Sequence, residues 1–163
     1  MTSTQLDATD LQLLARLQVN ASLSNQALAA LVHVSPPTCL RRVKRLLDAG
    51  LIERQIAVLS ADTLAEVIGH GLTAIVEITL DRQDQAALEA FERRVQSDDA
   101  VQQCYRVSPG PDFCLVVHAA NMPDYLALSQ RLFTADTNVR NVKTFFSIKR
   151  SKFGAQLPLP MKP

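Results

Sequence analysis

Four cationic side chains fall within five positions of the chain: Arg41, Arg42, Lys44 and Arg45. Cations at this density can neutralise phosphates and reach the edges of bases, which is the chemistry of nucleic-acid recognition. On a helix, one face would carry a polar stripe at i, i+3, i+4 and i+7: Thr38, Arg41, Arg42 and Arg45. The other face would carry an apolar stripe: Leu40, Val43, Leu46 and Leu47. A solvated basic face is the alternative interpretation, and the neighbouring elements decide between the two.

The stretch that carries these cations has the signals of a complete helix. Ser35 suits the N-cap and Pro36 the first helical position. Gly50 can adopt the left-handed conformation that ends a helix. The β-branched run at 51–59 then predicts an extended segment, either a wing or a connecting strand.

Two shorter helices are predicted upstream. Asp7 or Thr9 can cap the first, which runs to about Val19, and Ser24 can cap the second, which runs to about Val32. Three apolar residues of the second helix are expected to face the core: Leu28, Leu31 and Val32. A short turn then leads to the basic helix. This is the layout of a helix-turn-helix, whose second member enters the major groove of DNA, and it favours DNA binding over the solvated face.

Composition limits what else the chain can be. Residues 1–60 carry six Lys and Arg against four Asp and Glu, whereas the whole 163-residue chain has a net charge of only +1. Tight DNA binding would therefore need specific contacts, several copies of the chain, or both. No apolar run is long enough to span a bilayer and no signal peptide is apparent, so a cytoplasmic location is expected.

The cysteines and histidines suggest neither a metal centre nor a disulfide framework. The three cysteines, Cys39, Cys104 and Cys114, form no Cys-x-x-Cys pair, and the histidines, His33, His70 and His118, lie far apart. Cys104 and Cys114 flank one turn and could face each other, although burial as small apolar residues is the simpler expectation. We expect no metal, no cofactor and no catalytic residues.

The C-terminal half has a different periodicity. Apolar residues alternate over 72–80, 101–107, 113–119 and 139–148, which predicts four strands, and helical spacing follows Ala87 and Met122. The order β-α-β-β-α-β predicts a ferredoxin-like sheet with both helices on one face. Ile75 and the adjacent Phe145 and Phe146 leave the other face partly apolar, so we expect a second copy of the chain to cover it in a homodimer.

The fold class that follows is α+β with two domains. We predict a winged helix-turn-helix over residues 1–60, a ferredoxin-like domain over 61–153 and an extended, poorly packed tail over 154–163.

At this point the chain resembles the Lrp/AsnC family of transcriptional regulators over nearly its whole length. The most specific motif runs from Ser35-Pro36 through Arg41-Arg42-Val43 to Ala49-Gly50-Leu51-Ile52, and Leu6-Asp7-x-x-Asp10, Leu28-Ala29, Val107-Ser108 and Asp112-Phe113 also match. The resemblance implies that six residues approach DNA: Pro36, Pro37, Thr38, Arg41, Arg42 and Arg45. With Ser35, at the start of the same helix, they make seven predicted DNA-binding residues. It further implies dimers that assemble into octamers, with an amino-acid effector bound between neighbouring C-terminal domains.

The chain departs from the family in the turn between the second and third strands of that domain. Pro109 stands where a glycine is expected, although Asp112 keeps its place. Proline fixes φ and removes an N–H, so the backbone path and a ligand donor both change. The effector site implied by the resemblance is Ser108, Pro109, Gly110, Asp112, Met122 and Phe146, with Phe145 in a matching segment. Asp112 could instead satisfy turn amides, and Met122 and Phe146 could be core or interface residues.

Together these features predict a sequence-specific DNA-binding regulator that responds to an amino acid or a related metabolite. The alternative is an architectural protein that wraps DNA with little regard to sequence and has no effector.

Overall fold

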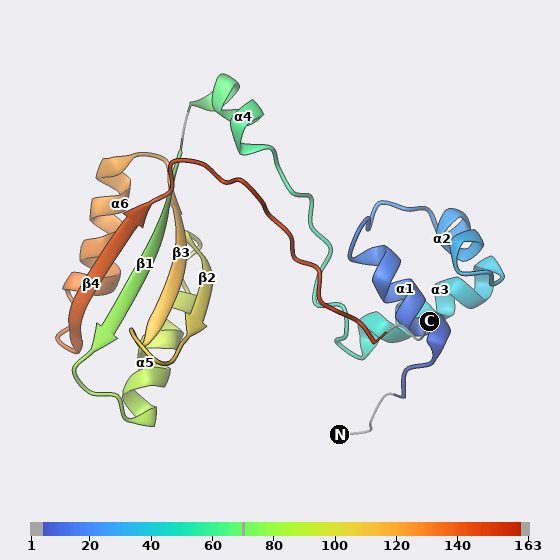
Figure 1. Cartoon of the computed structure of the whole chain (residues 1–163), viewed down its shortest axis with the longest axis horizontal. Coiled ribbons are helices and arrows are strands. Elements are labelled where there is room, and N and C mark those ends of the chain that lie inside the picture. The colour runs from blue at the N-terminus through green and yellow to red at the C-terminus, as the bar shows by residue number, and fades with distance from the viewer. Residues whose placement is uncertain (1–4, 70, 161–163) are drawn as a thin grey trace. The chain divides into compact units, whose positions relative to one another are not determined.

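The computed structural model describes residues 5–69 and 71–160, so His70 and the last three positions of the predicted tail lie outside the described residues. The chain divides into two compact units (Figure 1). One contains Met1–Val58 together with Lys152–Pro163, and the other contains Leu59–Ser151. Each has its own apolar core.

The first unit is a bundle of three helices, α1 (Ala8–Leu17), α2 (Asn25–Leu31) and α3 (Pro36–Asp48) (Figure 1). Local chemistry sets the starts of α1 and α2. Asp7 and Asp10 form a capping box, in which each side chain accepts a hydrogen bond from the other's backbone amide. The hydroxyl of Ser24 accepts from the amide of Ala27 at 3.2 Å. The predicted helix-turn-helix is confirmed.

The turn between α2 and α3 contains His33 in the left-handed region, with φ at 55°. Glycine is the residue that adopts this conformation without steric cost. Histidine tolerates it better than most side chains, which explains how the turn forms without the glycine that such turns often contain. Ser35 differs from the expectation, because its hydroxyl donates to Oγ1 of Thr38 at 2.9 Å and caps no backbone amide.

The predicted apolar stripe of α3 is wrong in part. Leu46 is fully buried, but Leu40 is 61% exposed and Leu47 is 42% exposed. The side that faces the other helices instead contains Cys39, Val43 and Leu46. In α2, Leu31 is also exposed, whereas Leu28 and Val32 are buried as expected. Helical spacing predicts how often a buried residue recurs, but the tertiary contacts determine which side of the helix faces the core.

The segment that follows α3 does not form the predicted strand. Residues 53–60 have no regular secondary structure, although they contain the exposed apolar side chains of Ile56, Val58 and Leu59. The β-branched residues there favour an extended backbone, but a strand also needs a hydrogen-bonded neighbour, and none lies among residues 5–69 and 71–160. The helix α4 (Ala61–Ile68) follows. Across the part of the chain that the structure describes, no helix is long and apolar enough to cross a membrane.

The second unit is a four-stranded antiparallel sheet with the strand order β2-β3-β1-β4 (Figure 1). Its strands are β1 (Leu72–Leu80), β2 (Val101–Arg106), β3 (Phe113–Ala119) and β4 (Val139–Phe146). Its helices are α5 (Gln85–Gln96) and α6 (Met122–Ser129), which continues as a π-helical turn, η1 (Gln130–Thr134). This order and topology confirm the predicted ferredoxin-like arrangement.

Alternation along the strands separates a buried face from an open one. In β1, Ala74, Val76, Ile78 and Leu80 are fully buried against the helices. The register places Phe145 opposite Ile75 and Phe146 opposite Ala74, so the two phenylalanines point to opposite faces, as predicted. Phe146 contacts Tyr125 of α6 edge to face at 5.0 Å, whereas Phe145 lies on the open face.

The C-terminal tail belongs with the helix-turn-helix unit, which the sequence did not indicate. The side-chain amide of Gln18, just after α1, donates to the carbonyl of Leu157 at 3.1 Å and accepts from the Leu157 amide at 2.9 Å. This paired contact is the one that two strands would exchange, with the glutamine amide in place of a peptide group. Its two hydrogen bonds hold Leu157 of the tail against the end of α1.

Candidate functional site

The N-terminal half of α3 presents an outward ridge. Pro36, Pro37 and Arg41 are exposed and Thr38 is half-buried. The start of the ridge is tied to α2, because the side-chain amide of Asn25 donates to the carbonyl of Pro36 at 2.8 Å. Lys44 is also exposed, one turn after Arg41 and on the same side. We call this surface the recognition ridge; it consists of Pro36, Pro37, Thr38, Arg41 and Lys44.

The other two cations of α3 turn toward α1. Nη1 of Arg42 lies 2.8 Å from Oδ1 of Asp10 and 2.6 Å from Oδ2 of Asp7. Nη2 of Arg45 lies 2.5 Å from Oδ2 of Asp10. The Asp10 side chain is fully buried, whereas Arg42 is 22% and Arg45 47% exposed. We call these four residues, Asp7, Asp10, Arg42 and Arg45, the Asp10 cluster.

The electrostatics of the cluster favour the charged forms of Asp7 and Arg42. A hydrogen bond from the amide of Asp10, and then one from Arg42, hold the pKa of the Asp7 carboxyl below its ordinary value of 3.8. The same carboxylates, Asp7 first and then Asp10, raise the pKa of the Arg42 guanidinium. Both carboxylates balance both guanidiniums, so the cluster has no net charge.

The sequence grouped Arg41, Arg42 and Arg45 on one exposed stripe, and the structure separates them. Arg41 lies on the recognition ridge, and Arg42 lies between α3 and α1. Arg45 has one nitrogen on Asp10 and a half-exposed side chain. Lys44 was not among the seven predicted residues. The signal that could have identified the cluster was the Leu6-Asp7-x-x-Asp10 motif, which supplies two carboxylates to an element that must pack against α3.

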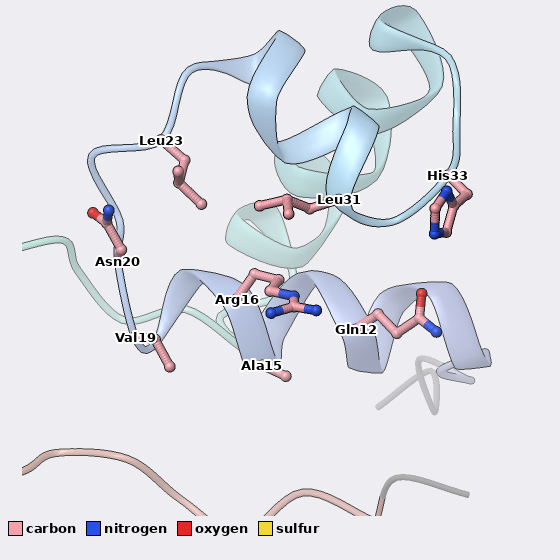
Figure 2. A pocket seen from close by; sticks show the side chains of 8 residues that line it. All are labelled: Gln12, Ala15, Arg16, Val19, Asn20, Leu23, Leu31 and His33. Carbon is pink, nitrogen blue, oxygen red and sulfur yellow. The ribbon is translucent and has the colours of Figure 1, made fainter. Parts of the chain in front are cut away.

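A concave surface in this unit lies between α1 and α2 (Figure 2). It is a groove of about 400 Å³, and the sequence analysis did not predict it. Its lining residues are Gln12, Ala15, Arg16, Val19, Asn20, Leu23, Leu31 and His33. The position of Leu31 in this groove explains its exposure. None of the predicted DNA-contacting residues lines it.

In the sheet unit, the Ser108–Asp112 turn is anchored to the end of β1. The amide of Asp112 donates to the carbonyl of Ile78 at 2.8 Å, and Oδ2 accepts from the amide of Leu80 at 2.7 Å. The side-chain amide of Gln83 donates to the same oxygen at 3.2 Å. Gly110 has φ at 124°, a conformation that favours glycine. One oxygen of Asp112 is therefore used to join strands, and Oδ1 accepts no hydrogen bond from residues 5–69 or 71–160.

The other predicted effector residues lie at the opposite end of the sheet. Met122 follows β3, whose last residue, Ala119, pairs with Leu72. Phe146 pairs with Ala74. Because Ala74 and Leu80 are six residues apart on one strand, roughly 20 Å separates these residues from the Ser108–Asp112 turn. One chain does not bring the six predicted residues together.

The open face of the sheet contains a row of paired residues that runs across all four strands. Gln103, Val116, Ile75 and Phe145 are opposite one another in the register. Ile75 is 44% and Phe145 52% exposed, and Tyr105 in the neighbouring row is 56% exposed. We call the surface formed by Ile75, Phe145, Tyr105 and Val116 the apolar sheet face.

Cys104 and Cys114 do not face each other. Cys104 pairs with Leu115 on the buried face, whereas Cys114 pairs with Tyr105 on the open face. Burial raises the pKa of the Cys104 thiol to about 11, so this cysteine is protonated at neutral pH. Among the described residues, no group of three or more His, Cys, Asp or Glu side chains could hold a metal ion.

Comparison with known proteins shows similarity in both units. Residues 6–47 match the AsnC-type helix-turn-helix domain, and residues 73–157 match the Lrp/AsnC ligand binding domain. The chain is 35% identical over 155 residues to the leucine-responsive regulatory protein of Rhizobium meliloti, covering 95% of this chain and 97% of that protein.

Solved structures agree over the same extent. An AsnC family transcriptional regulator from Agrobacterium tumefaciens superposes with a TM-score of 0.80 at 27% identity, covering 94% of this chain and 97% of that one. A transcriptional regulator of Neisseria meningitidis, solved as a complex with L-Met, superposes with a TM-score of 0.77 at 30% identity, covering 96% and 98%.

Proposed function

Because the chain belongs to the Lrp/AsnC family of transcriptional regulators, with a DNA-binding helix-turn-helix and a ligand-binding domain, we propose that it acts in the cytoplasm on specific DNA sites in response to an amino acid or a related metabolite. The recognition ridge carries the first half of this proposal. Arg41 and Lys44 are exposed on the second helix of the motif, and neither forms an ion pair with any residue that the structure describes.

The ridge suits the major groove for physical reasons. Arg41 can donate two hydrogen bonds to a guanine edge or grip a phosphate, and Lys44 can neutralise a phosphate. Pro36 and Pro37 contribute no amide hydrogen, so contacts near the start of the helix come from Thr38 and from Ser35, whose hydroxyl already donates to Thr38. Arg42 and Arg45, which the sequence also predicted to approach DNA, are paired with Asp10. They would have to leave these ion pairs to reach DNA.

Competition binding tests sequence specificity. The full chain is bound to a duplex selected from a random pool and is then challenged with unrelated duplex. We expect the selected duplex to resist at least a hundredfold excess of competitor, since specific binding is typically 10³–10⁷ times tighter than non-specific binding. Uniform affinity that disappears at modest salt would instead support an architectural DNA-wrapping protein.

We further propose a homodimer through the apolar sheet face. Large exposed apolar side chains on an otherwise folded sheet indicate an interaction surface, and a second copy offers the same surface through two-fold symmetry. A dimer would also present two recognition ridges to half-sites spaced by about one helical turn of DNA, roughly 34 Å or a multiple of it. Ile75→Lys should shift the sedimentation coefficient toward the monomer, while Thr63→Lys, on exposed α4, serves as the control.

The effector is proposed to be an amino acid bound between subunits. The L-Met in the Neisseria meningitidis structure supports an amino-acid ligand, and the separation of the Ser108–Asp112 turn from Met122 and Phe146 supports a pocket completed by a neighbouring chain. Oδ1 of Asp112 could accept a hydrogen bond from the ligand's ammonium group. Octamers built as four dimers would supply such a boundary.

A thermal-shift screen of the twenty amino acids tests the effector. A ligand that binds only the folded assembly at about a hundred times its Kd stabilises it by about 2.7 kcal/mol, so one amino acid should raise the melting temperature. Asp112→Ala should remove this shift, with Asp99→Ala as an acidic control elsewhere in the same unit. An unchanged shift in Asp112→Ala would place the pocket away from the turn.

A further inference from the structure

The buried carboxylate of Asp10 divides the four cations of α3 into two pairs. Arg42 and Arg45 turn inward to it, at 2.8 Å and 2.5 Å. Arg41 and Lys44, each one position earlier, are exposed. We propose that Asp10 is a positioning residue that withdraws Arg42 and Arg45 from DNA and leaves recognition to Arg41 and Lys44. This inference rests on the recognition ridge proposed above.

Asp10 is also held in place by hydrogen bonds that involve neither arginine. Its amide donates to Oδ1 of Asp7 at 2.9 Å, and its own Oδ2 accepts from the amide of Asp7 at 3.1 Å. The side chain is fully buried and therefore has no water to replace a lost partner. An arginine that moved to a phosphate would leave part of this carboxylate unpaired, and an unpaired buried charge is strongly unfavourable.

Arg42 pairs with two carboxylates, whereas Arg45 pairs with one. Arg42 bonds to both carboxylates and is 22% exposed, whereas Arg45 bonds to Asp10 alone and is 47% exposed. The Nε of Arg42 is buried without a hydrogen-bond partner in the described structure, so this side chain is already enclosed by its own protein. Arg42 is thus the more completely withdrawn of the two.

Withdrawal changes the kind of DNA binding. Each cation that reaches a phosphate adds sequence-independent affinity and steepens the dependence of binding on salt, by about 0.9 in the slope of log Kobs against log salt. The neutral Asp10 cluster lowers this background, and two cations remain that can contact base edges. The ratio of specific to non-specific affinity rises as a result.

Two neighbouring arginines provide a matched test in the full chain. Arg41→Gln and Arg42→Gln remove the same charge one residue apart. Binding of each variant to a random-sequence duplex is measured against salt, and the melting temperature is recorded. We expect Arg41→Gln to lower the slope by about 0.9 per DNA-binding head with an unchanged melting temperature. Arg42→Gln should keep the slope and lower the melting temperature.

The reverse experiment releases the arginines. Asp10→Asn keeps the shape of the side chain and removes its charge, and we expect a steeper slope, by up to about 2 per head, together with tighter binding to random-sequence duplex and weaker preference for a selected one. Asp7→Asn is a milder variant, to be used if Asp10→Asn does not fold. Asparagine still caps α1, and only one partner of Arg42 is lost. It should steepen the slope by less.

The outcomes separate the two proposals. A loss of slope in Arg42→Gln equal to that in Arg41→Gln overturns the role of Asp10. So does a release variant that loses affinity for all duplexes in step with its melting temperature and keeps the wild-type slope, because that is what a purely structural residue would show. Unimpaired DNA binding by Arg41→Gln would instead mean that the recognition ridge itself is misplaced.

Discussion

The helix-turn-helix unit and the sheet unit are each stabilised internally, and by different interactions. Thirteen buried residues form the core of the sheet unit, and none of them is charged. The helix-turn-helix core has six buried apolar residues, and beside it lies Asp10, the only charged side chain that is buried among the residues that the structure describes. A small unit that must keep one face polar for DNA has less apolar surface to bury, so an ion cluster joins its helices.

The two units therefore differ in what they tolerate. An apolar core accepts changes that keep volume and pattern, because its attraction is not directional. A buried ion cluster depends on each partner, because removing one leaves another charge uncompensated. This difference can be tested by substitutions in each unit.

The largest effect is expected for Asp10→Ala. Removing the carboxylate leaves Arg42 and Arg45 without their shared partner and should destabilise the helix-turn-helix unit by about 3–5 kcal/mol. Amide hydrogen exchange would show lost protection in α1–α3 and wild-type protection in β1 and β3. Wild-type protection in α1–α3 would mean that the cluster contributes little.

A smaller effect is expected for Ile78→Val in the sheet core. Ile78 is fully buried on β1, and deleting one methylene group there should cost about 0.5–1.5 kcal/mol. Urea denaturation of the sheet unit measures the change, and Val67→Ala, at an exposed position of the same unit, provides the control. A loss as large as that for Asp10→Ala would contradict the contrast between the two units.

His33→Gly should slightly stabilise the helix-turn-helix unit. Glycine removes a left-handed strain of about 1 kcal/mol, and its greater freedom in the unfolded chain offsets part of this, so we expect a net gain of about 0.5 kcal/mol. Thermal denaturation measures it, with His33→Ala as the comparison, because alanine keeps the strain. Equal melting temperatures for the two variants would contradict the strain.

The smallest effect concerns pH. The pKa of Asp7 is lower in the folded chain than its ordinary value of 3.8, so its contribution to stability is complete above that value and is lost as the pH falls through the folded pKa. Asp7→Asn caps α1 but does not titrate. Between pH 5 and pH 3, as a rough window around that value, denaturation midpoints of the wild type should therefore approach those of the variant. Parallel midpoints across this range would exclude Asp7 as a source of acid sensitivity.

Apart from the strand expected over 51–59, the sequence by itself determined the helices and strands named in the prediction and their order. Strand alternation over 72–80 and 113–119, the caps Asp7 and Ser24, and the position of Gly50 at φ 69° act between near neighbours, so they can be identified along the chain. The topology follows, because a β-α-β-β-α-β order with one apolar face per strand has few compact solutions. The outward direction of Arg41 was also accessible in this way.

The tertiary structure decided which cations are free and which residues meet. Arg42 is paired because α1 places Asp10, 32 residues earlier in the chain, against α3. The spacing of residues within one helix gives no information about a contact between residues so far apart in sequence. Similarly, Asp112 joins β1 through Leu80, Leu157 joins α1 through Gln18, and Met122 and Phe146 lie at the far end of the sheet from the turn. In each case the direction of a side chain depends on a partner distant in sequence, and only the packed structure brings the two together.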